Sequence, residues 1–327
     1  MNEIIRFIKN WMLPIAIVAG ISLFLAFHFL PFLSQAEPAF LRSASHVQPV
    51  LVSFMLFMQL TVVAPSDLKP RKWFIVLGAV QCLSFILLSL VASGMEIGLG
   101  RILVECAMLC LIAPTAAAAG VITAKIGGSI SHIMAYTVVI NVLAALLIPL
   151  MVPIVNPSAD IGFLASFWKI LKRVFSILVL PCAIAWLIRY TCPPLQKWLS
   201  ARAGWAFYIW GITLTLALAL ATGALVGSGI GVWETILIGL VSLLCCLFQF
   251  WAGRRAPGIT RMEKGTAEYR ADKVTAGQAL GQKNTGFVIW LGFMFLTPVT
   301  SVAGGFYAIW QNLVNSYELY EARKHSV

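Results

Sequence analysis

The sequence predicts an all-α integral membrane protein of about ten transmembrane helices. Its composition is the first observation: 60% of the residues are hydrophobic, only 11% are charged, and the mean hydropathy is +0.92. Soluble domains of this size do not have such a profile. The second observation is that apolar stretches of about 20 residues, the length that spans a bilayer as a helix, alternate with short polar segments. Both observations exclude a soluble globular protein.

The apolar stretches follow one another along the whole chain. The first is longer than the core of a signal peptide and lacks a small-residue cleavage site, and more stretches follow it, so we expect it to form a helix of the mature protein. The ninth is interrupted by GQKNTG at 281–286. The approximate bounds are 11–33, 48–64, 73–94, 101–124, 130–153, 168–190, 204–226, 231–252, 272–297 and 298–320.

The net charge of +11 comes from basic residues in the loops that flank these stretches. Most of the 23 Lys and Arg residues lie on the side that carries the N-terminus. Cytoplasmic loops hold the positive excess, so we expect a multi-pass protein of the plasma membrane, the inner membrane in a bacterium, with both termini cytoplasmic. Such flanking residues meet anionic lipid, so we expect a lipid bilayer as partner and no nucleic acid.

Seven cysteines are present, and nearly all of them lie inside apolar stretches without the spacing of a metal site. Small apolar packing residues are the simplest interpretation. The sequence therefore predicts neither disulfides, nor a metal, nor a cofactor.

The chain divides into two halves of five stretches each, 1–155 and 156–327. Pro14 and Pro181 lie in comparable settings in the first stretch of each half. The fourth stretch of each half is rich in small residues and broken by Pro or Gly, with APTAAAAGVIT at 113–123 and GQALGQKNTGFVI at 277–289. Because five is an odd number, we expect two repeats of inverted topology, with a binding site at the membrane midplane where the broken helices meet.

The backbone of a broken helix has unpaired amide and carbonyl groups that lipid cannot satisfy. Each break must therefore face protein, water or a ligand. Small residues allow two such segments to approach closely. We expect residues 116–120 to lie against Gly277, Gly281 and Gly286.

Four stretches together resemble the bile acid:sodium symporter family: the two broken ones, HIMAYTVVINVLAALLIPL at 132–150 and PVTSVAGGFYAIWQNLVNSYEL at 298–319. Related arsenite exporters and auxin-efflux-like carriers share much of the architecture. The resemblance implies a panel domain of helices 1, 2, 6 and 7 and a core domain of helices 3, 4, 5, 8, 9 and 10. In the core domain, the broken helices 4 and 9 would cross.

The chain departs from the family at the implied sodium ligands. Ala119 and Gly120 replace a Ser-Asn pair, Ala279 replaces a glutamate, and Lys283 replaces a glutamine. Of the implied sodium ligands, only Thr137 is retained. Sodium needs several oxygen ligands, so sodium coupling of the family's kind is disfavoured.

Lys283 lies inside an apolar stretch, where a charge costs about 2.5–3.5 kcal/mol on insertion scales and usually serves a function. One hypothesis is that its ammonium group takes the place of the bound cation, held by carbonyl groups and a helix end. A second is that it exchanges a proton during transport. The structural alternative is that its side chain snorkels to the membrane interface or forms a static pair with Glu105, the carboxylate in the interior of the fourth stretch.

Other polar residues of the stretches are candidates for substrate or ion contact. Their alternative role is helix packing, because buried hydroxyl and amide groups also bind between helices. They lie in both broken helices and in their neighbours: Thr115, Gln278, Gln282, Asn284, Thr285, Asn141 and Asn312.

The function that these features favour is secondary active transport of a small or amphipathic organic anion, independent of sodium. A sodium- or proton-coupled symporter of bile-acid-like or carboxylate substrates is the first alternative. A non-transporting membrane sensor or enzyme is the second. An enzyme would need paired carboxylates, a nucleophile with its base, or a metal cluster, and the sequence has no such pattern. We therefore expect no enzymatic activity.

Overall fold

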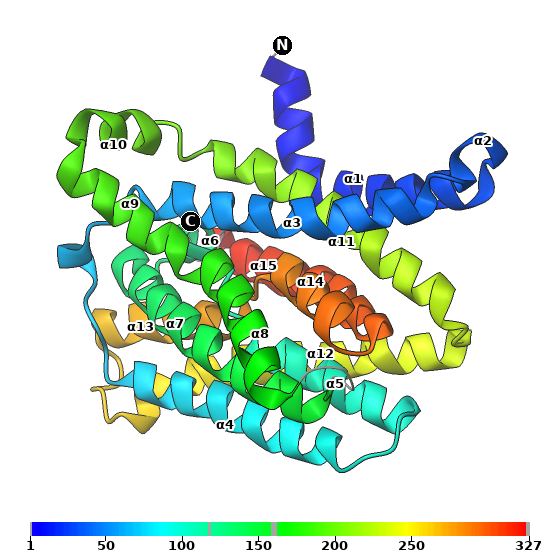
Figure 1. Ribbon diagram of the computed structural model, residues 1–327. Helices are drawn as coiled ribbons and strands as arrows, with labels where there is room; N and C mark the ends of the chain where they lie inside the picture. Colours follow the sequence, from blue (N-terminus) through cyan, green and yellow to red (C-terminus); the bar gives the residue numbers. More distant parts are fainter. Residues whose placement is uncertain (1, 117–118, 158–161, 325–327) are drawn as a thin grey trace.

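The computed structural model describes residues 2–116, 119–157 and 162–324, which form helices and no β-strand (Figure 1). The elements of the first half are α1 (Asn2–Phe29), α2 (Pro31–Ser34), α3 (Glu37–Leu60), η1 (Pro65–Asp67), α4 (Trp73–Ser93), α5 (Leu99–Ile112), α6 (Ala119–Lys125) and α7 (Ile130–Val155). Those of the second half are α8 (Phe163–Leu178), α9 (Leu180–Thr191), α10 (Pro193–Ser200), α11 (Trp205–Ser228), α12 (Val232–Ile259), α13 (Ala267–Gly281), α14 (Thr285–Phe295), η2 (Pro298–Thr300) and α15 (Ser301–Lys324).

Four helices, α4, α7, α11 and α12, are long and apolar enough to cross a membrane. The pair α8 and α9, bent by 44° at its junction, makes a fifth when counted as one span. The prediction of an all-α protein with membrane-spanning helices is confirmed at this level. Interruption explains why the two broken stretches do not count: α5 has 14 residues and α14 has 11, each shorter than a bilayer requires.

The helices pack in two groups. In one, α1 and α3 lie against α11, and α3 also contacts α8 and α9. In the other, α12 packs against α5, α13 and α15, and α4 packs against α5 and α7. The groups meet where α7 contacts α8 and where α14 contacts α3 and α11. In Figure 1 α3 and α9 lie above, α4, α5 and α12 lie below, and α14 and α15 lie between them.

The largest buried apolar cluster fills the space between the two groups. Met55 of α3, Phe85 of α4, Ile148 of α7 and Trp290 of α14 belong to it. Each of these side chains is at most 3% exposed. Lipid is as apolar as these side chains, so inside a bilayer their close van der Waals packing, and not transfer out of water, stabilises the contact between helices.

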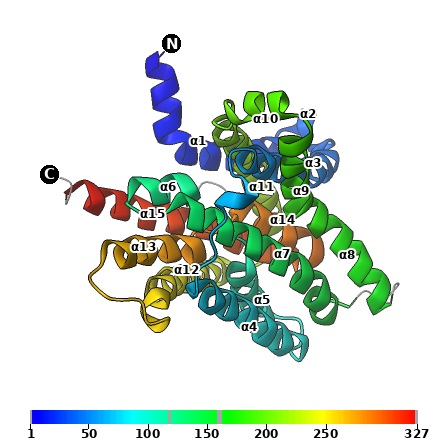
Figure 2. The ribbon, with the colours of Figure 1, turned by 90° about the vertical axis from the view of Figure 1, so that its left-hand side faces the viewer.

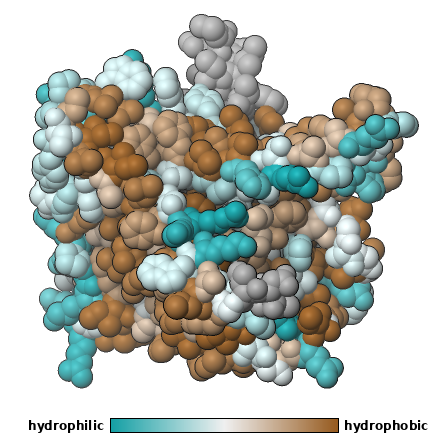
Figure 3. All heavy atoms as spheres, in the orientation of Figure 1, coloured by the Kyte–Doolittle hydropathy of each residue, from teal (hydrophilic) through white to brown (hydrophobic). Residues whose placement is uncertain are grey.

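Large apolar side chains also cover the outside of the molecule. Ile75 is 76% exposed, Leu87 62% and Leu164 65%. The face in Figure 3 is mostly hydrophobic, with hydrophilic residues at its edges and in a central patch. Monomeric soluble proteins rarely expose such extended apolar surface, which suits contact with lipid.

The connections between the long helices alternate between two ends of the molecule. In Figure 1 η1, α10 and the α12–α13 loop lie at the left end, whereas α2, the α4–α5 loop and the α11–α12 loop lie at the right end. Figure 2 looks at the left end and shows α6 beside α7 and α15, both of which it contacts. This alternation is explained if successive helices cross one layer in opposite directions.

Candidate functional site

The two predicted interruptions lie directly against each other. Helix α5 ends at Ile112 and α6 begins at Ala119, while α13 ends at Gly281 and α14 begins at Thr285. Between them, Thr115 and Lys283 form an isolated antiparallel bridge.

Hydrogen bonds across this bridge satisfy the exposed backbone of both breaks. The amide of Ala116 donates to the carbonyl of Gln282 at 2.8 Å, and the amide of Asn284 donates to the carbonyl of Pro114 at 2.9 Å. In a lipid environment such groups need an internal partner, and here each break supplies it to the other.

Two side chains fix the crossing further. The hydroxyl of Thr115, which is fully buried, donates to the carbonyl of Ala279 at 2.7 Å. The amide of Lys283 donates to Oε1 of Gln311 in α15 at 2.7 Å. The crossing is therefore held by both broken helices and by α15.

Lys283 is the charged residue at this crossing, and its side chain is only 1% exposed. Its Nζ lies 3.4 Å from the carbonyl oxygen of Leu111, and the structure describes no other hydrogen bond or salt bridge of this ammonium group. Leu111 belongs to the last turn of α5, where the carbonyl groups lack partners within the helix and the dipole is negative. The charge is therefore compensated by a helix end and by no carboxylate of the described residues.

Glu105 does not pair with Lys283, which corrects that structural alternative. Its Oε1 accepts from Nε of Arg101, one helical turn earlier, at 2.9 Å. Its Oε2 accepts from the amide of Thr297 at 3.2 Å. Glu105 therefore joins α5 to the end of α14, away from the crossing.

The polar neighbours of Lys283 are buried, and two of them have an unpaired atom. Oε1 of Gln282 and Nδ2 of Asn284 have no hydrogen-bond partner among the described residues. Oδ1 of Asn284 accepts from the amide of Phe287 at 3.2 Å and so caps α14. Thr285, the first residue of α14, is 3% exposed. Buried polar atoms without partners are rare and mark a place for a ligand or water.

Gln278 lies one turn before the break and faces α15. Its Nε2 donates to Oδ1 of Asn315 at 3.0 Å and to Oε2 of Glu318 at 2.7 Å. These bonds hold α13 against α15 and turn this amide away from Lys283.

The positions that correspond to the implied sodium ligands carry little oxygen. Ala119 and Gly120 begin α6 and are buried, while residues 117–118 lie outside the described residues. Thr137 donates its hydroxyl to the carbonyl of Ile133 in its own helix at 2.8 Å. None of these side chains turns an unused oxygen toward the crossing.

Asn141 and Asn312 differ in what they contact. Nδ2 of Asn141 lies 3.4 Å from the carbonyl of Leu178, at the junction of α8 and α9. Asn312 donates to the carbonyl of Ala308 in its own helix at 2.7 Å, and the described hydrogen bonds include none from its side chain to the broken helix. Its neighbour Gln311 makes that contact instead.

The side on which the glycines expected at the crossing lack a Cβ faces other neighbours than residues 116–120, of which 117–118 lie outside the described residues. A Cβ on Gly277 would lie 2.7 Å from Cγ of Arg254, one on Gly281 would lie 2.4 Å from the ring of Phe250, and one on Gly286 would lie 3.2 Å from Thr213. Gly277 and Gly281 therefore allow side chains of α12 to approach α13 closely. The crossing itself is formed by backbone groups of the two breaks.

Buried glutamines form a set that the sequence prediction missed. Nε2 of Gln81 donates to the carbonyls of Ile112 and Ala113 at 2.9 and 2.7 Å, which satisfies the end of α5. Gln48 of α3 donates to the carbonyl of Gly286 in α14 at 2.5 Å. The sequence contains a sign of this set, namely glutamines inside apolar stretches. There a side-chain amide raises the free energy unless it is hydrogen-bonded.

Tyr307 of α15 supports the other broken helix. Its hydroxyl donates to the carbonyl of Gly281 at 2.8 Å and accepts from Nε2 of Gln249 at 2.9 Å. The same amide of Gln249 lies 3.1 Å from the carbonyl of Cys110. The ends of α5 and α13 are thus joined through the buried side chains of Gln249 and Tyr307.

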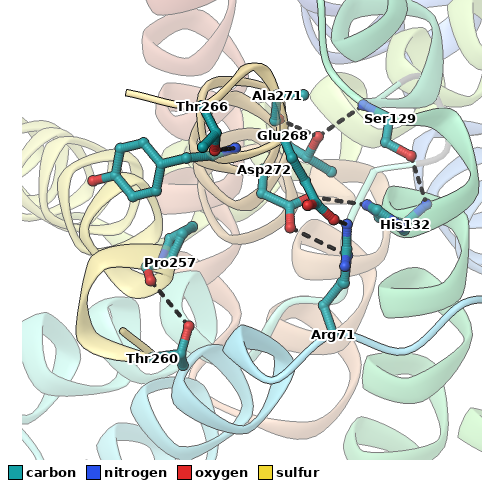
Figure 4. A network of polar contacts seen from close by, with 11 residues as sticks. Arg71, Ser129, His132, Pro257, Thr260, Thr266, Glu268, Ala271 and Asp272 are labelled. Carbon is teal, nitrogen blue, oxygen red and sulfur yellow. Dashed lines mark hydrogen bonds and ion pairs between the residues drawn. The ribbon is translucent and has the colours of Figure 1, made fainter. Parts of the chain in front are cut away.

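An ionic network at the other end of α13 was also missed (Figure 4). Oδ1 of Asp272 lies 2.8 Å from Nδ1 of His132, and its Oδ2 lies 3.2 Å from Nε of Arg71. Arg71 also pairs with Glu268. Asp272 is only 1% exposed. In the sequence it follows directly on a charged segment, and such a pattern does not predict a buried carboxylate.

Among the described residues, no group of three or more His, Cys, Asp or Glu side chains could hold a metal ion. A comparison with protein-family models and one with curated proteins found no match to this chain. The resemblance to the bile acid:sodium symporter family therefore stays a prediction.

Proposed function

We propose that this protein is a secondary active transporter that moves a small or amphipathic organic anion by alternating access, without a bound sodium ion. The observation that carries the proposal is the position of Lys283. Its ammonium group is buried where two interrupted helices meet, and its described partner is a backbone carbonyl at a helix end. A charge in this setting is a functional feature by default.

The arrangement of the helices supports the transporter architecture. We assign each of the ten predicted stretches to one helix or to a pair of helices separated by a break. The two groups described above correspond to a panel of α1, α3, α8, α9 and α11 and a core of the others, and both interruptions fall fourth in their half of the chain. We propose two inverted repeats whose groups rock against each other about the crossing.

The orientation in the membrane follows from the same arrangement. The end that carries η1, α10 and the α12–α13 loop also holds Lys69, Lys72, Lys197 and Arg261. We place this end in the cytoplasm together with both termini, and the protein in the plasma membrane.

Lys283 replaces the cation in this mechanism. Ala119, Gly120 and Ala279 offer no side-chain oxygen for sodium, whereas the last turn of α5 offers carbonyl groups and a negative dipole end. A fixed positive charge in a site of low dielectric attracts an anion strongly. The unpaired atoms of Gln282 and Asn284 provide polar contacts beside it.

The test is thermal unfolding of the purified protein with a set of organic anions, in sodium or in choline buffer. A bound anion raises the apparent Tm by mass action. We expect equal stabilisation in both buffers, and affinity that falls by about tenfold or more in Lys283→Gln, since one nearby charge contributes at least about 1.4 kcal/mol in such a site. Lys125→Gln, at an exposed lysine, is the matched control.

Stabilisation that requires sodium and is unchanged in Lys283→Gln would contradict the proposal. Uptake into proteoliposomes then distinguishes the coupling modes. Uptake driven by a pH gradient, and lost in Lys283→Gln, would assign proton exchange to this lysine instead.

A further inference from the structure

A groove of about 1100 Å³ runs along the outer side of α12, α13 and α15. On α12 it is lined by Leu243, Leu247, Trp251 and Arg255, which recur at helical spacing on one face. From Leu243 to Arg255 the helix rises by about 18 Å. The lining therefore changes along its length from apolar to basic.

Four cations gather at the basic end: Arg254, Arg255, Lys264 and Lys273. Arg254 is paired with Glu318. The other three are exposed, and the described salt bridges give none of them a carboxylate partner. The guanidinium of Arg255 lies 5.5 Å from the ring centroid of Trp251. This end of the groove thus carries positive charge that the protein itself does not neutralise.

The apolar end is exposed, and it belongs to a helix that is long enough to cross the membrane. Leu247 is 49% exposed, Trp251 57% and Leu313 on α15 58%. Tyr317, 63% exposed, lies on α15 one turn beyond Leu313. Aromatic side chains of this kind collect at the level of the lipid headgroups, so the apolar end points into the acyl region.

We propose that this groove binds one anionic phospholipid. Its phosphate would bind Arg255, Lys264 and Lys273, and an acyl chain would lie along Leu247 and Leu313. A soluble anion would use only the basic end, and a zwitterionic lipid would bring its own positive charge to it. Charge complementarity and the apolar length together therefore select the anionic lipid.

The groove also touches the supports of the broken helix. The ring of Phe250 fills the space over Gly281, and the side chain of Arg254 covers Gly277. Glu318, the partner of Arg254, accepts from Gln278. A lipid bound here stabilises α12 and α13 against each other. This inference concerns binding alone and does not rest on transport.

The experiment titrates detergent-solubilised protein with dioleoylphosphatidylglycerol and, separately, with dioleoylphosphatidylcholine. Retained lipid is counted by native mass spectrometry and the apparent Tm is measured. We expect one tightly held phosphatidylglycerol and a rise in Tm of at least about 2 °C. Soluble glycerol phosphate, which has the headgroup anion without acyl chains, should have no effect at the same concentration.

The triple variant Arg255→Gln, Lys264→Gln, Lys273→Gln should bind phosphatidylglycerol about 100-fold more weakly, since each basic residue near an anionic headgroup contributes about 1 kcal/mol. The matched control has the same change in charge on the exposed basic residues of α8: Lys169→Gln, Lys172→Gln, Arg173→Gln. The control should bind as the native protein does.

Three results would overturn the proposal. Equal retention of phosphatidylcholine would show that lipid binding in the groove does not require an anionic headgroup. Stabilisation by glycerol phosphate would make the groove a site for soluble anions. An equal loss of phosphatidylglycerol in both triple variants would show that net charge, and not this groove, binds the lipid.

Discussion

The two ends of α13 bury charge in opposite ways. At its beginning, the Asp272 carboxylate contacts the guanidinium group of Arg71 and Nδ1 of His132. Just beyond its end, Lys283 contacts a carbonyl oxygen. Each side chain is 1% exposed, so burial alone does not distinguish them.

The partners distinguish them. The buried Asp272 carboxylate is compensated by the guanidinium group of Arg71 and by its contact with His132, and its removal leaves both side chains without this partner. A buried ammonium without a carboxylate gains little for stability from its charge. We infer that the first end of α13 is a structural joint between α7, α13 and the loop before α4, and that the second end retains its charge for function.

The largest expected effect is therefore at the joint. Asp272→Ala should destabilise the protein by about 3–5 kcal/mol, because it removes the contacts of a buried carboxylate with both Arg71 and His132, and each bond to a charged group contributes about 1.5–3 kcal/mol. Thermal unfolding in detergent measures it as a lower apparent Tm. Glu268→Ala, one turn earlier, is the control: its carboxylate is 61% exposed and pairs with the same Arg71, so a change within about 1 kcal/mol is expected. Equal losses in both variants would contradict the assignment of the joint to Asp272.

A smaller effect is expected at the support of the crossing. Gln81→Leu would leave the carbonyls of Ile112 and Ala113 without their side-chain donor, at a cost of about 1–3 kcal/mol. The measurement is again thermal unfolding, with Gln59→Leu as the control at a glutamine that is only half-buried. If Gln81→Leu were as stable as the control, the end of α5 would not depend on this amide.

The sequence predicted the coarse fold and the position of both breaks. Hydropathy located the helices because lipid requires apolar stretches of fixed length, and Gly, Pro and polar residues located the breaks because they interrupt such stretches. That the two breaks meet followed from the same reasoning, whereas the pairing of Thr115 with Lys283 was not predicted.

What failed was the direction of individual side chains. Gln311 and Asn312 are adjacent in α15, and a rotation of 100° per residue decides which one faces the break. The glycines of α13 were assigned to the crossing, but they accommodate Phe250 and Arg254 of α12. Small residues indicate that something approaches closely, and they do not identify the neighbour. Long-range pairs such as Asp272 with His132 have no local pattern at all.

The smallest expected effect on stability is at Lys283 itself, and it sharpens the comparison most. Lys283→Met keeps an unbranched apolar side chain of similar volume and removes the ammonium group with its charge. Because no described carboxylate is left unpaired by the change, we expect stability within about 1 kcal/mol of the native protein, or above it. Anion binding, measured in the same samples, should be lost.

Lys125→Met, at an exposed lysine, should change neither property. A loss of stability in Lys283→Met as large as that of Asp272→Ala would mean that the lysine braces the crossing, and the two ends of α13 would then be alike. Native stability together with lost anion binding separates them, because the protein then keeps a buried charge that its fold does not need.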